Sequence, residues 1–330
     1  MKHPKRILTG LLLAGSTSLA LAACASGAVD GSAVSAEKAG DLATVRVGIF
    51  PSSMNAVFAY GEEKGLFEKH GIDIETTMGQ GSAALLPSLD SGKLDLAVAS
   101  TITPLVSQAH GMTLPIVSTF TADEGVPGST AVLLVGKGSE IQDVCGLKGK
   151  TVSVNALGSI GDTLISEDYA MHDCGDPAKD ITFIQLGFPD VPAQLASGQI
   201  DAGMAPSPFV QLVEADGGRQ LADFVMDTGV AKMELSVIAN EDFAREKSDT
   251  VAAFVAALTE AGEAANVDPD GVRAVLPEAL GSDEQAARAA VFETWTTAVD
   301  RPTIERWAEL AEKYGLVDAA PDVDAVIWQK

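Results

Sequence analysis

The sequence has few basic residues, few histidines and few aromatic residues. Its 330 residues include 22 lysines and arginines against 46 aspartates and glutamates, so the formal net charge is −24. Such an acidic surface repels nucleic acid and anionic lipid, and we therefore expect no nucleic-acid partner. Because 46% of the residues are apolar, the chain can form a sizeable core and is not of the disordered class.

The sequence also lacks the motifs of common enzyme classes. It contains no Gly-x-Ser-x-Gly motif, no Cys/His cluster with metal-ligand spacing and no phosphate-binding loop. His70 and His110 precede glycines that end predicted helices, and His172 lies in a last helical turn, where an imidazole favours the helix dipole. We therefore expect no catalytic residue, no metal ion and no cofactor.

Only three cysteines are present, and the first of them ends an N-terminal targeting segment. A basic start is followed by an apolar run that is interrupted by small polar residues. The run is short for a membrane span and typical of a signal peptide, which we assign to residues 1–23. It ends in Leu-Ala-Ala before Cys24, which resembles the lipobox of bacterial lipoproteins.

The lipobox resemblance implies that Cys24 is lipidated and becomes the N-terminus of the mature protein. Residues 24–44 are mostly small or polar and predict a flexible tether. The protein would then be exported and held on the outer face of the cell membrane through its lipid alone. The alternative is an ordinary signal peptide with a chance cysteine at its cleavage site.

The other two cysteines, Cys145 and Cys174, lie in a chain that faces an oxidising compartment. Cys145 belongs to a glycine-rich turn before a predicted strand, and Cys174 follows the helix after that strand. Because both ends of such a unit can meet at one edge of a sheet, we predict a disulfide. Two buried thiols are the alternative.

Strands and helices alternate regularly from residue 45, which predicts parallel pairing and an α/β fold. Since 330 residues exceed the usual span of one core, we expect two lobes. We assign residues 45–122 and 240–330 to the first lobe, and residues 123–239, with the hinge strands, to the second. The expected strands are 45–50, 72–77, 94–99, 114–120, 130–135, 151–154, 181–185, 200–205 and 233–239. The expected helices are 55–70, 82–91, 101–110, 159–173, 191–197, one from 209, 251–265, 283–299 and 303–314.

One pattern occurs twice, as LDSGKLDLAVAS at 89–100 and LASGQIDAGMAP at 195–206. Gly92 and Gly198 supply the left-handed residue that ends a helix, and Asp95 and Asp201 then open a strand. Ligands of α/β sheets bind at the opposite, carboxyl ends of the strands. We therefore interpret both aspartates as structural and expect ligand contacts just after each strand.

Longer segments resemble a known family, namely VRVGIF, NAVFAYGEEKGLFEKHGIDIE, GQGSAALLPSLDSGKLDLAVAS, LKGKTVSVNALGS and FPDVPAQLASGQIDAGMAPSPF. They are similar to bacterial substrate-binding lipoproteins of ABC importers for nitrate, sulfonates and taurine, some relatives of which bind the pyrimidine precursor of thiamine. The resemblance implies a two-lobe periplasmic-binding-protein fold of type II, with mainly parallel sheets flanked by helices and two hinge strands. It also implies a monomeric receptor that passes a small solute to a permease with an ATPase subunit.

In such a fold the ligand meets carboxyl ends of strands and N-termini of helices. Each polar position there can also be a helix cap, and each aromatic one a core residue. No lysine or arginine is among these positions, so a pyrimidine-type heterocycle competes with a sulfonate, taurine or nitrate as ligand. The candidate ligand-binding residues are Ser52, Asn55, Gln80, Gly81, Ser82, Ser100, Thr101, Phe120, Asn155, Ser159, Phe188 and Ser207.

Two other classes of function stay open alongside the receptor. One is an enzyme on the same fold, against which the missing motifs argue. The other is a sensor that signals to a membrane partner without transport, which needs the same closing cleft.

Overall fold

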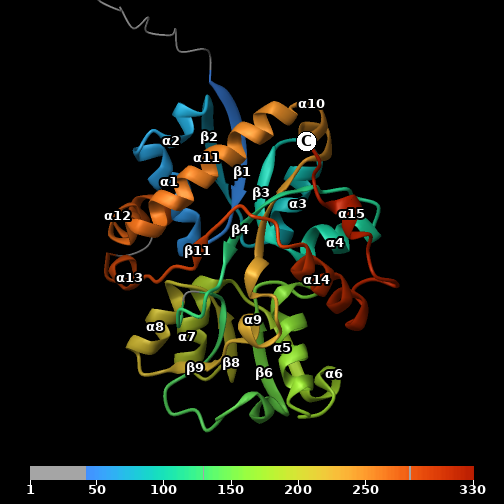
Figure 1. Cartoon of the computed structure of the whole chain (residues 1–330). Coiled ribbons are helices and arrows are strands. Elements are labelled where there is room, and N and C mark those ends of the chain that lie inside the picture. Colours follow the sequence, from blue (N-terminus) through green and yellow to red (C-terminus); the bar gives the residue numbers. More distant parts are fainter. Residues whose placement is uncertain (1–41, 129, 282–283) are drawn as a thin grey trace, which may run out of the picture. The chain divides into compact units, whose positions relative to one another are not determined.

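The computed structural model describes residues 42–128, 130–281 and 284–330, which form two α/β lobes (Figure 1). The predicted signal peptide, Cys24 and most of the predicted tether lie outside the described residues. Within the described ranges, no helix has the length and apolar character needed to cross a lipid bilayer.

The first lobe is built on a six-stranded sheet with the order β11-β4-β10-β3-β1-β2. β1 runs parallel to β2 and β3, whereas β10 runs antiparallel to β3 and β4. The strands are β1 (Ala43–Ile49), β2 (Ile72–Met78), β3 (Leu96–Ser100), β4 (Ile116–Ala122), β10 (Leu235–Ala239) and β11 (Thr294–Trp295).

The second lobe is built on a five-stranded sheet with the order β7-β6-β8-β5-β9. β6 runs parallel to β7 and β8, and β5 runs antiparallel to β8 and β9. The strands are β5 (Val132–Val135), β6 (Lys150–Val154), β7 (Ile181–Gln185), β8 (Ala202–Ala205) and β9 (Arg219–Ala222).

Both sheets share one arrangement. In each sheet, a strand that has crossed from the other lobe lies antiparallel beside three parallel strands. β5 enters the second sheet after β4, and β10 returns to the first sheet. The sheet pairing therefore places residues 235–239 in the first lobe, whereas the expected boundary placed them with the second. The predicted two-lobe α/β fold is confirmed.

Helices cover both sheets. The first lobe contains η1 (Ser53–Asn55), α1 (Ala56–Glu63), α2 (Leu66–Lys69), α3 (Ser82–Asp90) and α4 (Ile102–Ala109). The second contains η2 (Val144–Leu147), α5 (Ile160–Met171), α6 (Pro177–Asp180), η3 (Phe188–Asp190), α7 (Val191–Ala196), α8 (Phe209–Ala215), α9 (Phe224–Asp227) and η4 (Ala231–Met233). The C-terminal segment forms α10 (Glu241–Glu246), α11 (Ser248–Val267), α12 (Pro269–Leu280), α13 (Glu284–Ala289), α14 (Arg301–Lys313) and α15 (Val323–Val326).

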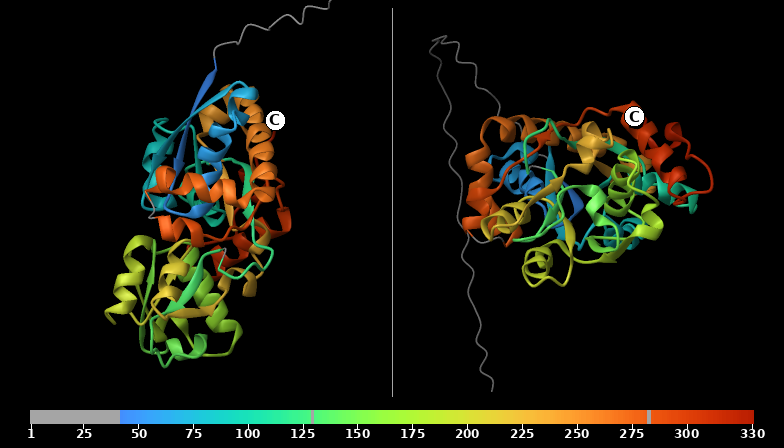
Figure 2. Two further views of the ribbon diagram at one scale, coloured as in Figure 1. Left: turned by 90° about the vertical axis from the view of Figure 1, so that its left-hand side faces the viewer. Right: turned by 90° about the horizontal axis from the view of Figure 1, so that it is seen from below.

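The C-terminal helices pack mainly on the first lobe, as expected. α11 and α12 contact α1, and α14 contacts α4. Figure 1 shows the orange α11 and α12 beside the blue α1, and the red α14 and α15 beside the teal α4. Figure 2 gives two further views of this arrangement. Aromatic rings fill this part of the core, where Phe58 of α1 lies beside Phe67, Phe120 and Phe254 with ring centroids 5.6–6.4 Å apart.

Two predicted helices differ in the structure, and two strands, β9 and β11, were not predicted. The helix expected over 55–70 is divided, because Gly65 adopts a left-handed conformation with φ of 67° between α1 and α2. The helix expected over 283–299 ends at Ala289, and Thr294 and Trp295 form β11 on the edge of β4. β9, which the sequence pattern missed, completes the second sheet.

The repeated pattern has the structural role that was predicted. Gly92 and Gly198 have φ of 66° and 69°. The carboxylate of Asp95 accepts the backbone N–H of Arg46 at 2.8 Å, and that of Asp201 accepts the backbone N–H of Thr151 at 2.9 Å. Each aspartate also donates its own backbone N–H to the carbonyl of the same neighbour. The two copies thus fasten equivalent strands in the two lobes.

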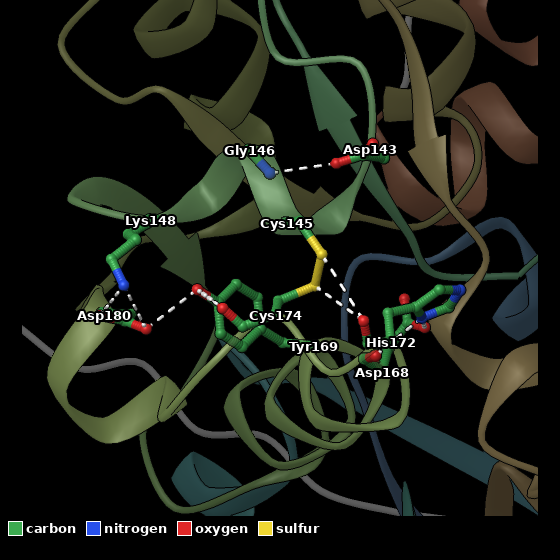
Figure 3. The surroundings of a disulfide bond; sticks show 9 residues. All are labelled: Asp143, Cys145, Gly146, Lys148, Asp168, Tyr169, His172, Cys174 and Asp180. Carbon is green, nitrogen blue, oxygen red and sulfur yellow. Dashed lines mark hydrogen bonds and ion pairs between the residues drawn. A yellow bond between two sulfur atoms is a disulfide. The ribbon is translucent and has the colours of Figure 1, made fainter.

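The predicted disulfide is present in the second lobe (Figure 3). Cys145 belongs to η2 and Cys174 follows α5, with their Cα atoms 4.9 Å apart. The hydroxyl of Tyr169, in α5, donates to the carbonyl of Cys174 at 3.2 Å and to the carboxylate of Asp180 at 3.1 Å (Figure 3). The disulfide therefore joins η2, which precedes β6, to the end of α5, which follows β6. The alternative of two buried thiols is wrong.

Candidate functional site

A small cavity lies between the lobes, at the carboxyl ends of the parallel strands of both sheets. Its volume, taken as the space that the centre of a water molecule can occupy, is about 20 Å³. This is room for about one water molecule. Both crossing strands contribute to it, because the antiparallel β5 and β10 begin at this same edge. The lining residues are Phe50, Ser52, Ser82, Ser100, Ala131, Asn155, Ile160, Phe188, Met204, Pro206, Glu234, Leu235 and Glu293.

Larger hollows occur on the surface. One of about 620 Å³ lies between α5, α6 and the end of α14 and includes Asp162, Phe183 and Tyr314. None of its lining residues directly follows a strand of either sheet. We take the smaller cavity as the candidate site because α/β sheets bind ligands where the carboxyl ends of strands meet.

Five of the predicted site residues line this cavity: Ser52, Ser82, Ser100, Asn155 and Phe188. Ser82 begins α3, and its hydroxyl accepts the backbone N–H of Ser100 at 3.1 Å, which joins that helix to the end of β3. Ser52 caps η1 after β1, and Asn155 directly follows β6. The pattern of polar residues after strands therefore located both sides of the cavity.

Gln80 and Gly81 lie next to the second lobe, although neither is among the lining residues given above. A Cβ atom on Gly81 would lie 2.9 Å from Nδ2 of Asn155, and one on Gly187 would lie 3.2 Å from Oε1 of Gln80. The absence of a side chain at Gly81 therefore allows Asn155 to approach the start of α3.

Three other predicted residues make structural contacts instead. The side chain of Asn55 donates to the carbonyl of Phe50 at 2.8 Å, and the hydroxyl of Thr101 donates to that of Ser236 at 3.3 Å. The ring of Phe120 is 1% exposed and stacks on an aromatic ring of α1. Contacts of these three residues with a ligand stay predictions.

The last two predicted residues lie at helix starts or lobe contacts. Ser159 caps α5, and the carboxylate of Asp162 accepts its backbone N–H at 3.0 Å. Ser207 joins the lobes, because its carbonyl accepts the backbone N–H of Ser53 at 3.0 Å and its hydroxyl accepts that of Val291 at 3.1 Å. Ser207 therefore holds the two lobes together beside the cavity.

Two acidic residues of the cavity were missed by the sequence prediction. Glu234, directly before β10, is 3% exposed, and Glu293, directly before β11, is 5% exposed. Oε2 of Glu234 accepts the hydroxyl of Thr130, whereas Oε2 of Glu293 has no hydrogen-bond partner among the residues that the structure describes. The signal available in the sequence was an acidic residue within an apolar run, as in KMELSVIA and VFETW.

Burial raises the pKa of the Glu234 carboxyl to about 8, while the Thr130 hydrogen bond opposes that rise. Burial also raises the pKa of Glu293 well above its ordinary value, and the neighbouring Glu234 raises it further, while the nearby Thr121 hydroxyl opposes the rise. Asp123 and Asp223 add to both shifts. Perturbed acids in a cavity are typical of functional sites.

A second contact between the lobes centres on Glu167 of α5, which is 3% exposed. Its carboxylate binds Arg306 at 2.7 Å, Lys313 at 2.5 Å and the hydroxyl of Tyr314 at 2.7 Å, all in or directly after α14. Burial would raise its pKa, but these three partners lower it overall. The second lobe is thus attached to α14 by an ionised group. No group of three or more His, Cys, Asp or Glu suited to hold a metal ion occurs in residues 42–128, 130–281 and 284–330.

The solved structures that are similar to this chain include two binding proteins. The alkanesulfonate-binding protein SsuA of Xanthomonas axonopodis pv. citri, bound to MOPS, has a TM-score of 0.72 at 21% identity over 88% of this chain and 100% of that one. The periplasmic nitrate-binding protein NrtA of Synechocystis PCC 6803 has a TM-score of 0.70 at 16% identity over 88% and 86% of the two chains. At these identities the likeness shows the shared periplasmic-binding-protein fold.

Sequence comparison adds a family. A Haemophilus influenzae (strain ATCC 51907 / DSM 11121 / KW20 / Rd) protein named "Putative thiamine biosynthesis protein" is 30% identical over 149 residues, which are 45% of this chain and 44% of that protein. The alignment thus spans less than half of that relative. A family model described as NMT1/THI5 like matches residues 53–272. Because this match covers most of both lobes, the chain belongs to the NMT1/THI5-like family.

Proposed function

We propose that this protein is the solute-binding receptor of an ABC importer. The observation that carries the proposal is the cavity lined by both lobes at the carboxyl ends of their strands. A small organic solute enters when the lobes part, is enclosed when they close, and is passed to the permease with its ATPase subunit. The receptor acts as a monomer and catalyses no reaction.

The sequence left two ligand classes open, and the cavity favours the second. A simple sulfonate or nitrate would place its anionic group beside the buried carboxyl groups of Glu234 and Glu293, whereas taurine would have to direct its ammonium group to them. A pyrimidine heterocycle of the thiamine-precursor kind offers N–H donors to those groups and to Asn155. The partial likeness to a protein named for thiamine biosynthesis supports the same class.

A thermal-shift screen of the purified protein tests the ligand class. The compounds are taurine, ethanesulfonate, nitrate, 4-amino-5-hydroxymethyl-2-methylpyrimidine and thiamine. We expect the aminopyrimidine to raise the melting temperature, with about 2.7 kcal/mol of stabilisation at a hundredfold excess over its dissociation constant. A sulfonate or nitrate that stabilises more strongly would show that the ligand class is wrong.

Transport is tested with the permease and its ATPase reconstituted in vesicles. The loaded receptor should stimulate ATP hydrolysis and uptake of the bound compound, and receptor without the compound should stimulate less. Tight binding without any stimulation would indicate the sensor instead of the importer. Turnover of the compound by the receptor alone would indicate an enzyme.

Attachment at Cys24 is part of the proposal. Cys24→Ser removes the thiol that would be acylated, so the protein should move from the detergent phase to the aqueous phase in Triton X-114 partitioning. The Cys145→Ser/Cys174→Ser variant, which retains Cys24, is the control. Equal partitioning of the Cys24→Ser variant and the native protein would exclude a lipid anchor there.

A further inference from the structure

The end of α5 holds two residues in unfavourable surroundings, and the first is Asp168 (Figure 3). Asp168 is 1% exposed, and neither of its carboxylate oxygens has a hydrogen-bond partner among the residues that the structure describes. Nδ1 of His172 lies 3.1 Å from Oδ1 of Asp168 and 2.9 Å from the carbonyl of Asp168, so one ring nitrogen serves two oxygens. Burial and the neighbouring Asp227 of α9 raise the pKa of Asp168 to about 6, against the opposing effect of His172. A buried carboxylate with so few donors costs free energy.

The second such residue is Asp173, directly after the helix. Its φ is 55°, and it is the only residue other than glycine with a positive φ in the described part of the chain. Such residues rarely adopt this left-handed conformation, and they keep it only where neighbouring contacts hold the backbone. Glycine adopts it without cost and is the usual residue at this position after a helix. The end of α5 is therefore held by contacts outside the helix.

The disulfide is the covalent fastener at this point. Cys174 directly follows Asp173, and its bond to Cys145 ties the end of α5 to η2. Cys145 is exposed and Cys174 is partly exposed, and exposed disulfides are the more easily reduced ones. The carbonyl of His172 lies 3.9 Å from Sγ of Cys145 and 3.7 Å from Sγ of Cys174, so it can accept the hydrogen of either thiol once the bond is broken.

α5 also carries the charged contact between the lobes. Glu167 lies in its last two turns, and the partners of the Glu167 carboxylate are Arg306, Lys313 and the hydroxyl of Tyr314. Charge-assisted hydrogen bonds are strong only in good geometry. A shift of the end of α5 would therefore weaken the attachment of the second lobe to α14.

We infer that the disulfide between Cys145 and Cys174 is a redox-sensitive switch of lobe closure, which acts through the end of α5 on the Glu167 contact. The intact bond holds Asp173 in its left-handed conformation and keeps Glu167 in position for α14. After reduction the end of α5 relaxes, its buried carboxylate gains water, and the lobes separate more readily. The hydroxyl of Tyr169 still binds the carbonyl of Cys174, so the change stays local. The inference rests on the proposed receptor function and states how its site is regulated.

The reductant is a dithiol. Its thiolate attacks one sulfur of the disulfide and forms a mixed disulfide, while the other cysteine leaves as a thiolate and takes up a proton. The second thiol of the reductant then displaces the remaining cysteine and gives its proton to that sulfur. The protein thus gains two hydrogen atoms as two thiols, and the dithiol is oxidised to a disulfide.

Small-angle X-ray scattering and hydrogen exchange of the Cys24→Ser protein, with and without dithiothreitol, test the switch in the absence of any ligand. Cys24→Ser leaves Cys145 and Cys174 as the only cysteines, and mass spectrometry after alkylation counts their thiols. Circular dichroism verifies that the reduced protein is folded. We expect two thiols, a larger radius of gyration and at least about tenfold faster amide exchange at residues 167–173.

Asp173→Gly distinguishes a switch from a general loss of stability. Glycine keeps the left-handed conformation without the disulfide, so reduction of this variant should change the scattering and the exchange by about half as much or less. Asp216→Gly is the matched control, because Asp216 is an exposed aspartate at the end of α8 with an ordinary φ of −83°. This control should respond to reduction like the parent protein, and an Asp173→Gly variant that responds as strongly would overturn the switch.

Glu167→Gln tests the route between the disulfide and the lobes. If the disulfide acts through Glu167, reduction should add little to the increase in radius that the substitution causes by itself. Additive increases would show that the disulfide and Glu167 act independently, and the inference would be wrong.

Two further results would overturn the switch. One is a reduced protein with unchanged scattering and exchange, and the other is a disulfide that dithiothreitol does not reduce in the folded protein. Reduction should also weaken the binding of 4-amino-5-hydroxymethyl-2-methylpyrimidine about fivefold, and equal binding by both forms would overturn the regulatory role. If neither form binds this compound, the proposed ligand is wrong, and the scattering still decides the switch.

Discussion

The acidic residues beside the strands of this protein differ in their partners. Asp95 and Asp201 lie at the amino ends of strands and accept backbone N–H groups of Arg46 and Thr151. Glu293 lies at the opposite end of the sheet and keeps an oxygen without a partner in the described part of the chain. The two aspartates are therefore structural, and the glutamate is available to a ligand.

Replacing each aspartate of the repeated pattern by alanine should destabilise the protein without changing ligand binding. Asp95→Ala leaves a backbone N–H and Arg46 without their partner at a site where the Asp95 side chain is 7% exposed, and should cost about 2–3 kcal/mol. The side chain of Asp201 is 38% exposed, so its replacement should cost about 1 kcal/mol. Urea unfolding measures both, and a larger loss for Asp201→Ala would contradict this assignment.

Glu234→Gln should stabilise the ligand-free protein, increasingly so as the pH rises. The pKa of Glu234 is raised from 4.5 to about 8 in the folded protein, so the folded state retains a proton that the unfolded state releases. This costs stability as the pH rises above 4.5, by at most about 3 kcal/mol at pH 7, and the loss levels off above about 8. At pH 4 the variant and the native protein should be alike.

Unfolding free energies at pH 4, 6 and 8 verify the Glu234 prediction, with Glu140→Gln as control. A stability difference that stays constant over this pH range would show that the Glu234 carboxyl is ionised at neutral pH.

At the level of elements, the differences between expected and observed structure have local causes. The pattern of residues 55–70 is amphipathic throughout, but Gly65 takes a left-handed conformation that ends α1. Residues 290–299 contain β-branched and aromatic side chains, and Trp295 exchanges hydrogen bonds with the side chain of Asn266 in α11. This partner, 29 residues away in the sequence, holds the segment as an edge strand.

The disulfide fastens η2 to the end of α5, and its removal should lower the stability of the second lobe. The cysteines are 29 residues apart, for which the chain-entropy model gives about 3.5 kcal/mol. The Cys145→Ser/Cys174→Ser variant should therefore unfold at a lower urea concentration. The native protein with reductant should show the same loss, and an unchanged midpoint in both would contradict the prediction.

For the whole molecule, buried polar residues help to join the two lobes. Ser207 binds backbone groups of Ser53 and Val291. Glu167 binds Arg306, Lys313 and Tyr314. Both contacts connect residues that are far apart in the sequence. They therefore form only when the two lobes pack against each other.

Glu167→Gln should weaken lobe closure, because it removes the charge that pairs with two cations of α14. We expect a larger radius of gyration in small-angle X-ray scattering of the ligand-free protein, and about fivefold weaker ligand binding. Glu305→Gln is the matched control, because it removes an exposed ion pair between Glu305 and Arg301 within α14. Equal scattering of the two variants and the native protein would show that Glu167 does not support closure.

The amino-acid sequence predicts the alternation of strands and helices, the two similar lobes and the role of Asp95 and Asp201, because these depend on local periodicity and on glycines that end helices. It also located Ser52, Ser82, Ser100, Asn155 and Phe188 at the cavity, since polar residues that follow parallel strands converge at one edge of a sheet. The fold was needed to show that Glu234 and Glu293 share that cavity and that Phe120 is a core residue. Burial and electric field at a position depend on neighbours that are distant in the sequence, and no local pattern records them.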